Sequence, residues 1–203
     1  NYGLYVGSPA ASLSVQSTTI RDNNGVGLYV AQGTLGLQSV AVAGTGGAYS
    51  MSLPGDAPLT TAGTHSFDKP IELRAAAVSG NTIWRNLGAP YVSSGTVYVY
   101  KDTTAASSLT IEPGVEVRFN QYQALYVGYS TNKGTLTAQG TATAPILFTS
   151  NKTPKARGDW FGLLFQPGAG SGSSLQYATV EYGGYGGYSN VYISRSSPVI
   201  ANS

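Results

Sequence analysis

The same short apolar sequence recurs along this chain, and such recurrence is the mark of a fold assembled from repeated units. Gly-Leu-Tyr-Val at residues 3–6 occurs again at residues 27–30, 24 residues later. Variants follow as Ala-Leu-Tyr-Val at residues 124–127 and Asn-Val-Tyr-Ile at residues 190–193. A turn region rich in Gly, Ser or Asn follows each copy, and further short apolar runs come after it. Three short strands in a repeat of 24 or more residues indicate a parallel β-helix.

A single turn of this length cannot bury its own apolar face, so successive turns have to stack. Stacking places each strand beside its counterparts in the neighbouring turns, at about 4.8 Å. Side chains alternate across a strand, so Leu4 and Val6 are expected inside and the residue between them outside. The same alternation predicts an exposed file of tyrosines, namely Tyr5, Tyr29, Tyr126 and Tyr192.

The pattern predicts an all-β fold with three short strands in each turn and almost no helix. The best helical candidate, residues 71–78, is short and follows Pro70. We expect one continuous solenoid over residues 1–203. Residues 44–95 are less regular and contain four prolines, so wider loops are expected there. A linker between two separate β-helices is the alternative interpretation of that stretch.

The composition excludes several classes of protein. The 203 residues include no Cys and one His, and 10% are charged, against roughly 25% in an average globular protein. Disulfides, thiolate metal sites and multi-His zinc sites are therefore excluded. The formal net charge is +2 and no basic run is present, which argues against a nucleic-acid partner. No apolar stretch is long enough for a membrane-spanning helix, and we expect no membrane insertion, metal or cofactor.

Catalysis on polysaccharides by a β-helix needs acids clustered on one outer face. The nine acids of this chain are scattered along it, and no Asp-Asp or Asp-x-Asp pair occurs. Glu112 and Glu116 are close in sequence, but the Pro-Gly corner between them favours solvent-facing positions. His65 has no neighbouring Ser or acid constellation beyond Asp68. We therefore predict no catalytic residue.

Tyrosines are the strongest signal for an interaction, because an exposed Tyr offers amphipathic area at little entropic cost. The alternative is a tyrosine ladder that only stabilises neighbouring strands. Beside the four tyrosines of the predicted file, the interaction candidates are Tyr182, Tyr185 and Tyr188.

The two ends of the sequence also fit together. When residues 200–203 are joined directly to residues 1–6, the resulting ten residues are comparable with the eleven of the corner at residues 20–30. We expect one unit of a tandem array or a subunit that stacks head to tail, with a fragment cut at arbitrary points as the alternative. The end-turn residues of such a contact are Leu4, Tyr5, Val6, Val191, Tyr192, Ile193, Val199 and Ile200.

Motifs in the C-terminal half resemble those of a known family. They are Ser-Leu-Thr-Ile-Glu-Pro-Gly-Val-Glu-Val (108–117), Gly-Thr-Leu-Thr-Ala-Gln-Gly-Thr-Ala (134–142), Pro-Ile-Leu-Phe-Thr-Ser (145–150), Gly-Asp-Trp-Phe-Gly (158–162) and Val-Glu-Tyr-Gly-Gly (180–184). Together they resemble bacterial extracellular right-handed parallel β-helix repeat proteins, the pectate-lyase-like solenoids of surface or adhesin type. The resemblance covers about residues 95–200 and implies a right-handed coil at an extracellular or cell-surface location. Pectate lyases, tailspikes, adhesins and surface repeats share this fold, so it leaves the activity open.

These observations predict a non-catalytic extracellular structural or adhesive β-solenoid. Its expected partner is itself, through head-to-tail or lateral association, and carbohydrate is a further candidate. A carbohydrate-binding or polysaccharide-degrading β-helix is the alternative function. A receptor-binding spike fragment is the third hypothesis.

Overall fold

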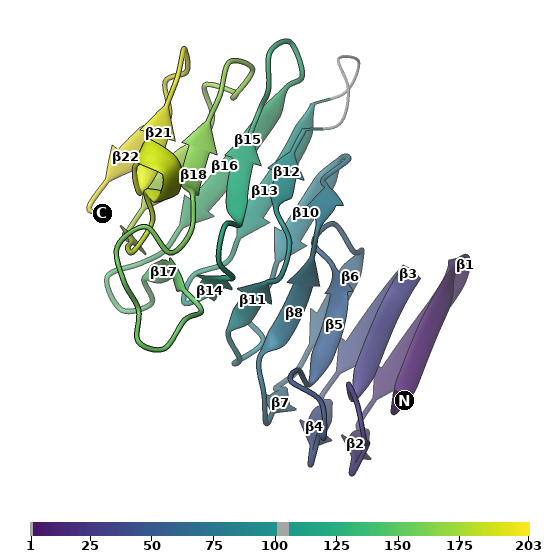
Figure 1. Ribbon diagram of the computed structural model, residues 1–203. Coiled ribbons are helices and arrows are strands. Elements are labelled where there is room, and N and C mark those ends of the chain that lie inside the picture. Colours follow the sequence, from purple (N-terminus) through teal and green to yellow (C-terminus); the bar gives the residue numbers. More distant parts are fainter. Residues whose placement is uncertain (1, 101–105) are drawn as a thin grey trace.

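The computed structural model describes residues 2–100 and 106–203, and these form a coil of short β-strands. Strands of successive turns lie side by side from the N-terminal to the C-terminal end of the coil (Figure 1). Within the described residues the single helical element is η1 (Tyr185–Gly187), one turn of 3-10 helix. None of the described segments forms a helix long and apolar enough to span a bilayer. The predicted all-β parallel β-helix with almost no helix is confirmed.

The strands pair into four sheets, all of them parallel, that run along the coil. The nine-stranded sheet, here sheet A, contains β1 (Leu4–Gln16), β3 (Leu28–Gln38), β5 (Met51–Pro54), β6 (Leu59–Ala62), β8 (Ile71–Arg74), β11 (Tyr91–Ser93), β14 (Glu116–Phe119), β17 (Ile146–Ser150) and β20 (Ala178–Val180). Sheet B contains β2 (Thr19–Arg21), β4 (Ala41–Ala43) and β7 (Ser66–Phe67). Sheet C contains β9 (Ala76–Ala77), β12 (Val97–Val99), β15 (Ala124–Val127), β18 (Gly162–Phe165) and β21 (Val191–Ile193). Sheet D contains β10 (Asn81–Trp84), β13 (Ser107–Ile111), β16 (Gly134–Gln139), β19 (Ser174–Gln176) and β22 (Val199–Ala201).

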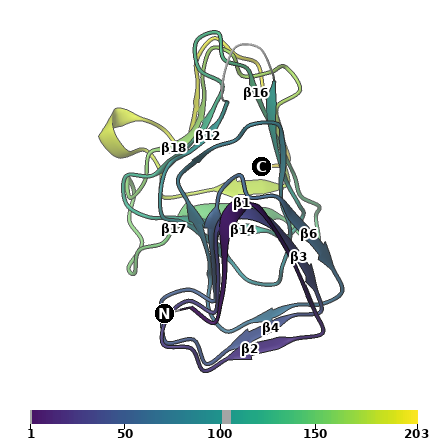
Figure 2. The same cartoon turned by 90° about the vertical axis from the view of Figure 1, so that its right-hand side faces the viewer.

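The cross-section of the coil changes between β7 and β10. In the first turns the chain runs along sheet A, bends within the same long strand and continues into sheet B. In the later turns it passes from sheet A to sheet C and then to sheet D. Seen along the coil, β2 and β4 lie at one side and β12 and β16 at the opposite side (Figure 2). Residues 44–95, expected to be irregular, contain this change.

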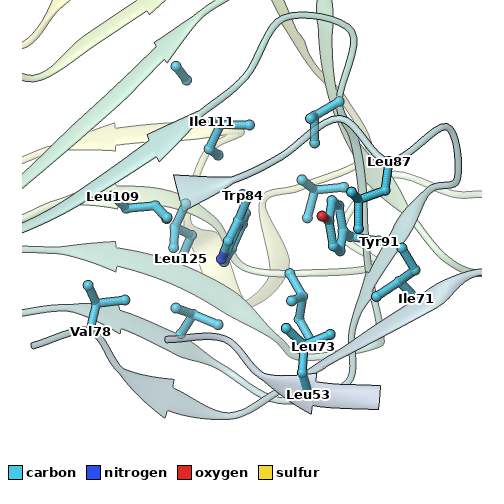
Figure 3. Packing of buried hydrophobic residues seen from close by; sticks show 14 of the residues in the cluster. Leu53, Ile71, Leu73, Val78, Trp84, Leu87, Tyr91, Leu109, Ile111 and Leu125 are labelled. Atoms are coloured by element: carbon cyan, nitrogen blue, oxygen red, sulfur yellow. The ribbon is translucent and has the colours of Figure 1, made fainter. Parts of the chain in front are cut away.

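Sheet A crosses the change of cross-section without a break. Strands β5, β8 and β11 pair in sequence, and the proposal of one continuous solenoid rests on these pairings. On the neighbouring face, Arg85 Nε donates to the carbonyl of Leu59 at 3.2 Å, across the hollow between β6 and β10. In the core beside it, Trp84 and Tyr91 lie with ring centroids 6.4 Å apart (Figure 3). These two large side chains fill the interior where the outline of the coil changes.

The core is a set of aligned rows, because parallel pairing places matching inward positions on top of one another. One row of sheet A passes through Leu28, Met51, Ile71, Tyr91, Val117 and Phe148, all at most 1% exposed. The inward positions expected for Leu4 and Val6 agree, with Val6 buried and Leu4 packed against the core. Tyr91 is an exception to the expectation that tyrosines face out, and its hydroxyl donates to the carbonyl of Arg85 at 2.7 Å.

Phe119 tests how strongly this interior holds the later turns together. Its ring stacks on Trp160 with centroids 4.1 Å apart and planes 2° apart, and both residues are fully buried. Phe119→Ala is expected to lower the free energy of unfolding by about 3–5 kcal/mol, because it leaves a cavity beneath the indole. Phe119→Leu, which keeps most of the volume, is expected to cost less. Urea denaturation measures both, and an unchanged midpoint for Phe119→Ala would contradict the described packing.

Candidate binding surface

Aromatic side chains gather on the outer face of sheet C and on the loops at its two edges. Six of these tyrosines are between 36% and 55% exposed, so the rings are accessible to a partner. We call this set the tyrosine surface: Tyr98, Tyr100, Tyr122, Tyr126, Tyr129, Phe161, Tyr185, Tyr188 and Tyr192.

A row that crosses four strands forms the centre of the surface. Tyr98 pairs in register with Tyr126, Tyr126 with Leu164, and Leu164 with Tyr192. The row faces out because the residues on either side of Tyr98, Tyr126 and Leu164 are fully buried in the core. The Tyr98 and Tyr126 rings stack with centroids 5.4 Å apart. Leu164 points outward and is nevertheless fully buried, so side chains outside the sheet cover it.

Two tyrosines extend the surface beyond the C-terminal ends of the strands. Tyr100 stacks on Tyr129 at 5.7 Å and meets the edge of Tyr98 at 5.6 Å. Burial raises the pKa of the Tyr100 phenol, and the nearby phenols of Tyr98, Tyr129 and Tyr126 raise it further. Burial likewise raises the pKa of Tyr126, with smaller contributions from Tyr188 and Tyr98. These phenols therefore stay neutral at physiological pH.

The loops before β18 and β21 supply the other edge of the surface. The Phe161 ring meets Tyr185 edge to face at 5.2 Å and Tyr188 at 5.5 Å. Tyr185 also contacts Tyr122 at 4.4 Å, and Tyr188 contacts Tyr192 at 5.3 Å. The amide of Tyr185 donates to the carbonyl of Trp160 at 3.0 Å, which holds η1 against the preceding turn.

A buried carboxylate fixes the first of these loops. Asp159 Oδ2 accepts hydrogen bonds from the Ser150 hydroxyl at 2.7 Å and the Ala156 amide at 2.8 Å. Its Oδ1 pairs with Lys152 Nζ at 2.9 Å. Burial alone would raise the pKa of Asp159, but these hydrogen bonds and the Lys152 charge outweigh it and lower the pKa. Because Asp159 is the second residue before Phe161, this anchor positions the loop edge of the tyrosine surface.

The structure brings four of the predicted interaction residues together and separates the other three. Tyr126, Tyr185, Tyr188 and Tyr192 belong to the tyrosine surface. Tyr182 lies apart, with Lys155 Nζ 5.8 Å from its ring centre. It lines a separate hollow of about 420 Å³ together with Arg157, Glu181, Gly183 and Asn190.

The predicted single file of Tyr5, Tyr29, Tyr126 and Tyr192 is wrong, because its members occupy two sheets. Tyr5 and Tyr29 pair on β1 and β3 of sheet A, where their rings stack at 5.7 Å. Arg74 lies over the Tyr29 ring at 4.4 Å. The recurring apolar signature forms a strand of sheet A before the change of cross-section and of sheet C after it.

The interaction candidates chosen from the sequence leave out five members of the tyrosine surface: Tyr98, Tyr100, Phe161, Tyr122 and Tyr129. The first two follow from alternation in Val-Tyr-Val-Tyr at residues 97–100, a local signal that was available. Phe161 has no such signal, because a long-range loop contact positions it.

The predicted end-turn residues occupy the outermost strands. Leu4, Tyr5 and Val6 lie on β1, at the edge of sheet A. Val191, Tyr192 and Ile193 form β21, and Val199 and Ile200 belong to β22. Ile193, Val199 and Ile200 are 47%, 52% and 45% exposed. The first turn thus presents strands of sheets A and B, whereas the last presents strands of sheets A, C and D.

The acids of the outer faces each have a separate partner. Glu112 pairs with Arg85 at 3.1 Å, and Glu116 pairs with Arg118 at 2.7 Å. Glu181 accepts from the Thr149 hydroxyl at 2.7 Å. In the part of the chain that the structure describes, no three His, Cys, Asp or Glu side chains are grouped to hold a metal ion. His65 Nδ1 accepts from the Val40 amide at 3.3 Å, an arrangement consistent with a structural role.

Asp159→Asn tests the loop anchor. The folded-state pKa of Asp159 is lowered, so its contribution is complete above the unfolded value of about 3.9 and is lost as the pH falls through the folded value. We expect the wild-type melting temperature to fall between neutral pH and about pH 3. Asp159→Asn is expected to have a lower melting temperature than the wild type at neutral pH. Its melting temperature should also fall less on acidification. Asp22→Asn, which removes an exposed pair with Arg21, is the control. Identical pH profiles for wild type and Asp159→Asn would refute the anchor.

Comparison with known proteins identifies a family for this chain. The family model of the pectate-lyase-like β-helix domain matches residues 79–194. No curated protein and no solved structure matches the chain. The matched segment begins just before β10 and includes every member of the tyrosine surface. Because it spans more than half of the chain and agrees with the stacked parallel sheets, this chain belongs to the pectate-lyase-like β-helix domain family.

Proposed function

We propose that this chain is a non-catalytic, extracellular structural or adhesive β-helix that contacts its partner through the tyrosine surface. The observation that carries the proposal is the exposed aromatic area on sheet C and on the loops at its edges. A Tyr side chain has two rotatable angles, so it gives large contact area at low entropic cost. Strand pairing already holds the central rings in place, so binding costs them little further conformational entropy.

The distribution of acids supports a non-catalytic role. Glycoside hydrolysis uses two carboxylates that face each other across the substrate, about 5–10 Å apart. Here Glu112, Glu116 and Glu181 interact with different partners, and those partners come from different turns. The separate hollow beside Tyr182 has a single acid, Glu181, in its lining.

Head-to-tail stacking is a second candidate, and the exposed apolar residues of β21 and β22 favour it. Unpaired strand edges invite another strand to add. The two end turns differ in their sheets, so a unit that followed directly would require a second change of cross-section at the seam. Electron microscopy of the purified protein tests this candidate. Filaments with a rise equal to the length of one unit would support it, and discrete particles at all concentrations would exclude it.

An assay for polysaccharide depolymerisation tests the non-catalytic proposal. Neutral polysaccharides, and polygalacturonate with and without Ca²⁺, are incubated with the protein, and new reducing ends and unsaturated products are measured. We expect no product above a heat-denatured control. Product formation that Glu112→Gln or Glu181→Gln abolishes would contradict the proposal, because it would assign an acid to catalysis.

A further inference from the structure

The tyrosine surface has a direction, which limits the shape of what can lie on it. Its central row crosses the strands, so it runs along the coil with one residue for each strand spacing of about 4.8 Å. The Tyr98 and Tyr126 rings on β12 and β15 stack with their planes 22° from parallel, so each ring covers part of the other's face and leaves its edge and hydroxyl to solvent. On β21, Tyr192 continues the row beyond the buried Leu164. An extended chain of flat units parallel to the coil axis would meet the Tyr98 and Tyr126 rings and, beyond Leu164, the Tyr192 ring.

The surface also has a definite polarity. Its members are eight tyrosines and one phenylalanine, so it presents aromatic faces and phenol hydroxyls and no formal charge. Two cations of the nearby loop, Lys152 and Lys155, are engaged elsewhere. Lys152 pairs with Asp159, and Lys155 donates to the Thr149 hydroxyl at 2.9 Å beside Glu181.

We infer that the tyrosine surface binds a neutral polysaccharide whose chain lies along the coil axis. This inference rests on the proposed function and names the partner of the same surface. A sugar ring has an apolar C–H face that packs on an aromatic ring, and its hydroxyls can exchange hydrogen bonds with phenols at the ring edges. The neutral surface matches a neutral chain, because neither partner has to desolvate a charge on contact.

The same charge argument disfavours polyanions. Single-stranded nucleic acids also stack on aromatic rings, but their binding sites add Lys and Arg that neutralise the phosphates. An acidic polysaccharide needs cations for the same reason. The hollow that contains Arg157 and Tyr182 has a cation, and it lies apart from the central row.

Affinity electrophoresis tests the inference, with soluble β-glucan and galactomannan as neutral probes and polygalacturonate as the acidic probe. We expect the neutral polysaccharides to retard the wild-type protein and polygalacturonate to leave it unretarded. Tyr98→Ala with Tyr192→Ala removes two exposed rings at the ends of the row. This variant is expected to raise the dissociation constant by about tenfold or more. Tyr98→Phe with Tyr192→Phe keeps the rings and should lose less affinity.

Tyr2→Ala with Tyr5→Ala is the matched control, because it removes two exposed, mutually stacked tyrosines, one just before β1 and one on β1 of sheet A. Circular dichroism confirms that each variant is folded. Absence of retardation by both neutral probes would overturn the inference, as would an equal loss of affinity in the control. Polygalacturonate retardation that Arg157→Gln removes would overturn it too, because it would move the site to the separate hollow.

Sedimentation of the same variants separates failure of this inference from failure of the proposed function. In one outcome, the wild type self-associates and binds no glycan, and the double variant Tyr98→Ala with Tyr192→Ala fails to self-associate. This pair of results would assign the surface to a second copy of the chain. That result would overturn the glycan inference and leave the adhesive function standing. Depolymerisation of a probe would instead contradict the proposed function.

Discussion

Parallel pairing between strands of successive turns is the interaction on which everything else in this molecule depends. Most strands have only two to six residues, too few to bury a face alone, so each turn is ordered by its neighbours. Pairing in register aligns Leu28, Met51 and Ile71 inside the coil. The same register aligns Tyr98 and Tyr126 outside it. The core and the tyrosine surface therefore both result from the same parallel strand pairing.

Much of the fold could be predicted because alternation is a local property of the sequence. Val-Tyr-Val at residues 97–99 already requires that the Tyr face out when the valines face in. Which sheet a strand joins is not local. The same apolar signature places Tyr29 on sheet A and Tyr126 on sheet C, because wider loops and the packing of Trp84 against Tyr91 change the outline between them. The position of Phe161 depends on the buried Asp159 anchor, whose hydrogen bonds to Ser150 and Ala156 are set by the folded loop.

Two outer regions of the later turns differ in chemistry, and the difference matters for function. The tyrosine surface is broad, neutral and aromatic, whereas the hollow beside Tyr182 contains Arg157 and Glu181. Glu112, Glu116 and Glu181 interact with different partners, Arg85, Arg118 and Thr149. A fold shared by enzymes and adhesins does not determine function, so the proposed function rests on such local features, here the aromatic surface.

Nuclear magnetic resonance of the protein with isotope-labelled tyrosine rings tests the central claim most directly. Soluble oligomers of a neutral polysaccharide are titrated into the folded protein, and ring resonances are assigned by single Tyr→Phe substitutions. The account predicts saturable shifts at Tyr98, Tyr126 and Tyr192, with Tyr5 and Tyr29 unchanged. Shifts confined to Tyr5 and Tyr29, or no saturable shift at any ring, would contradict it.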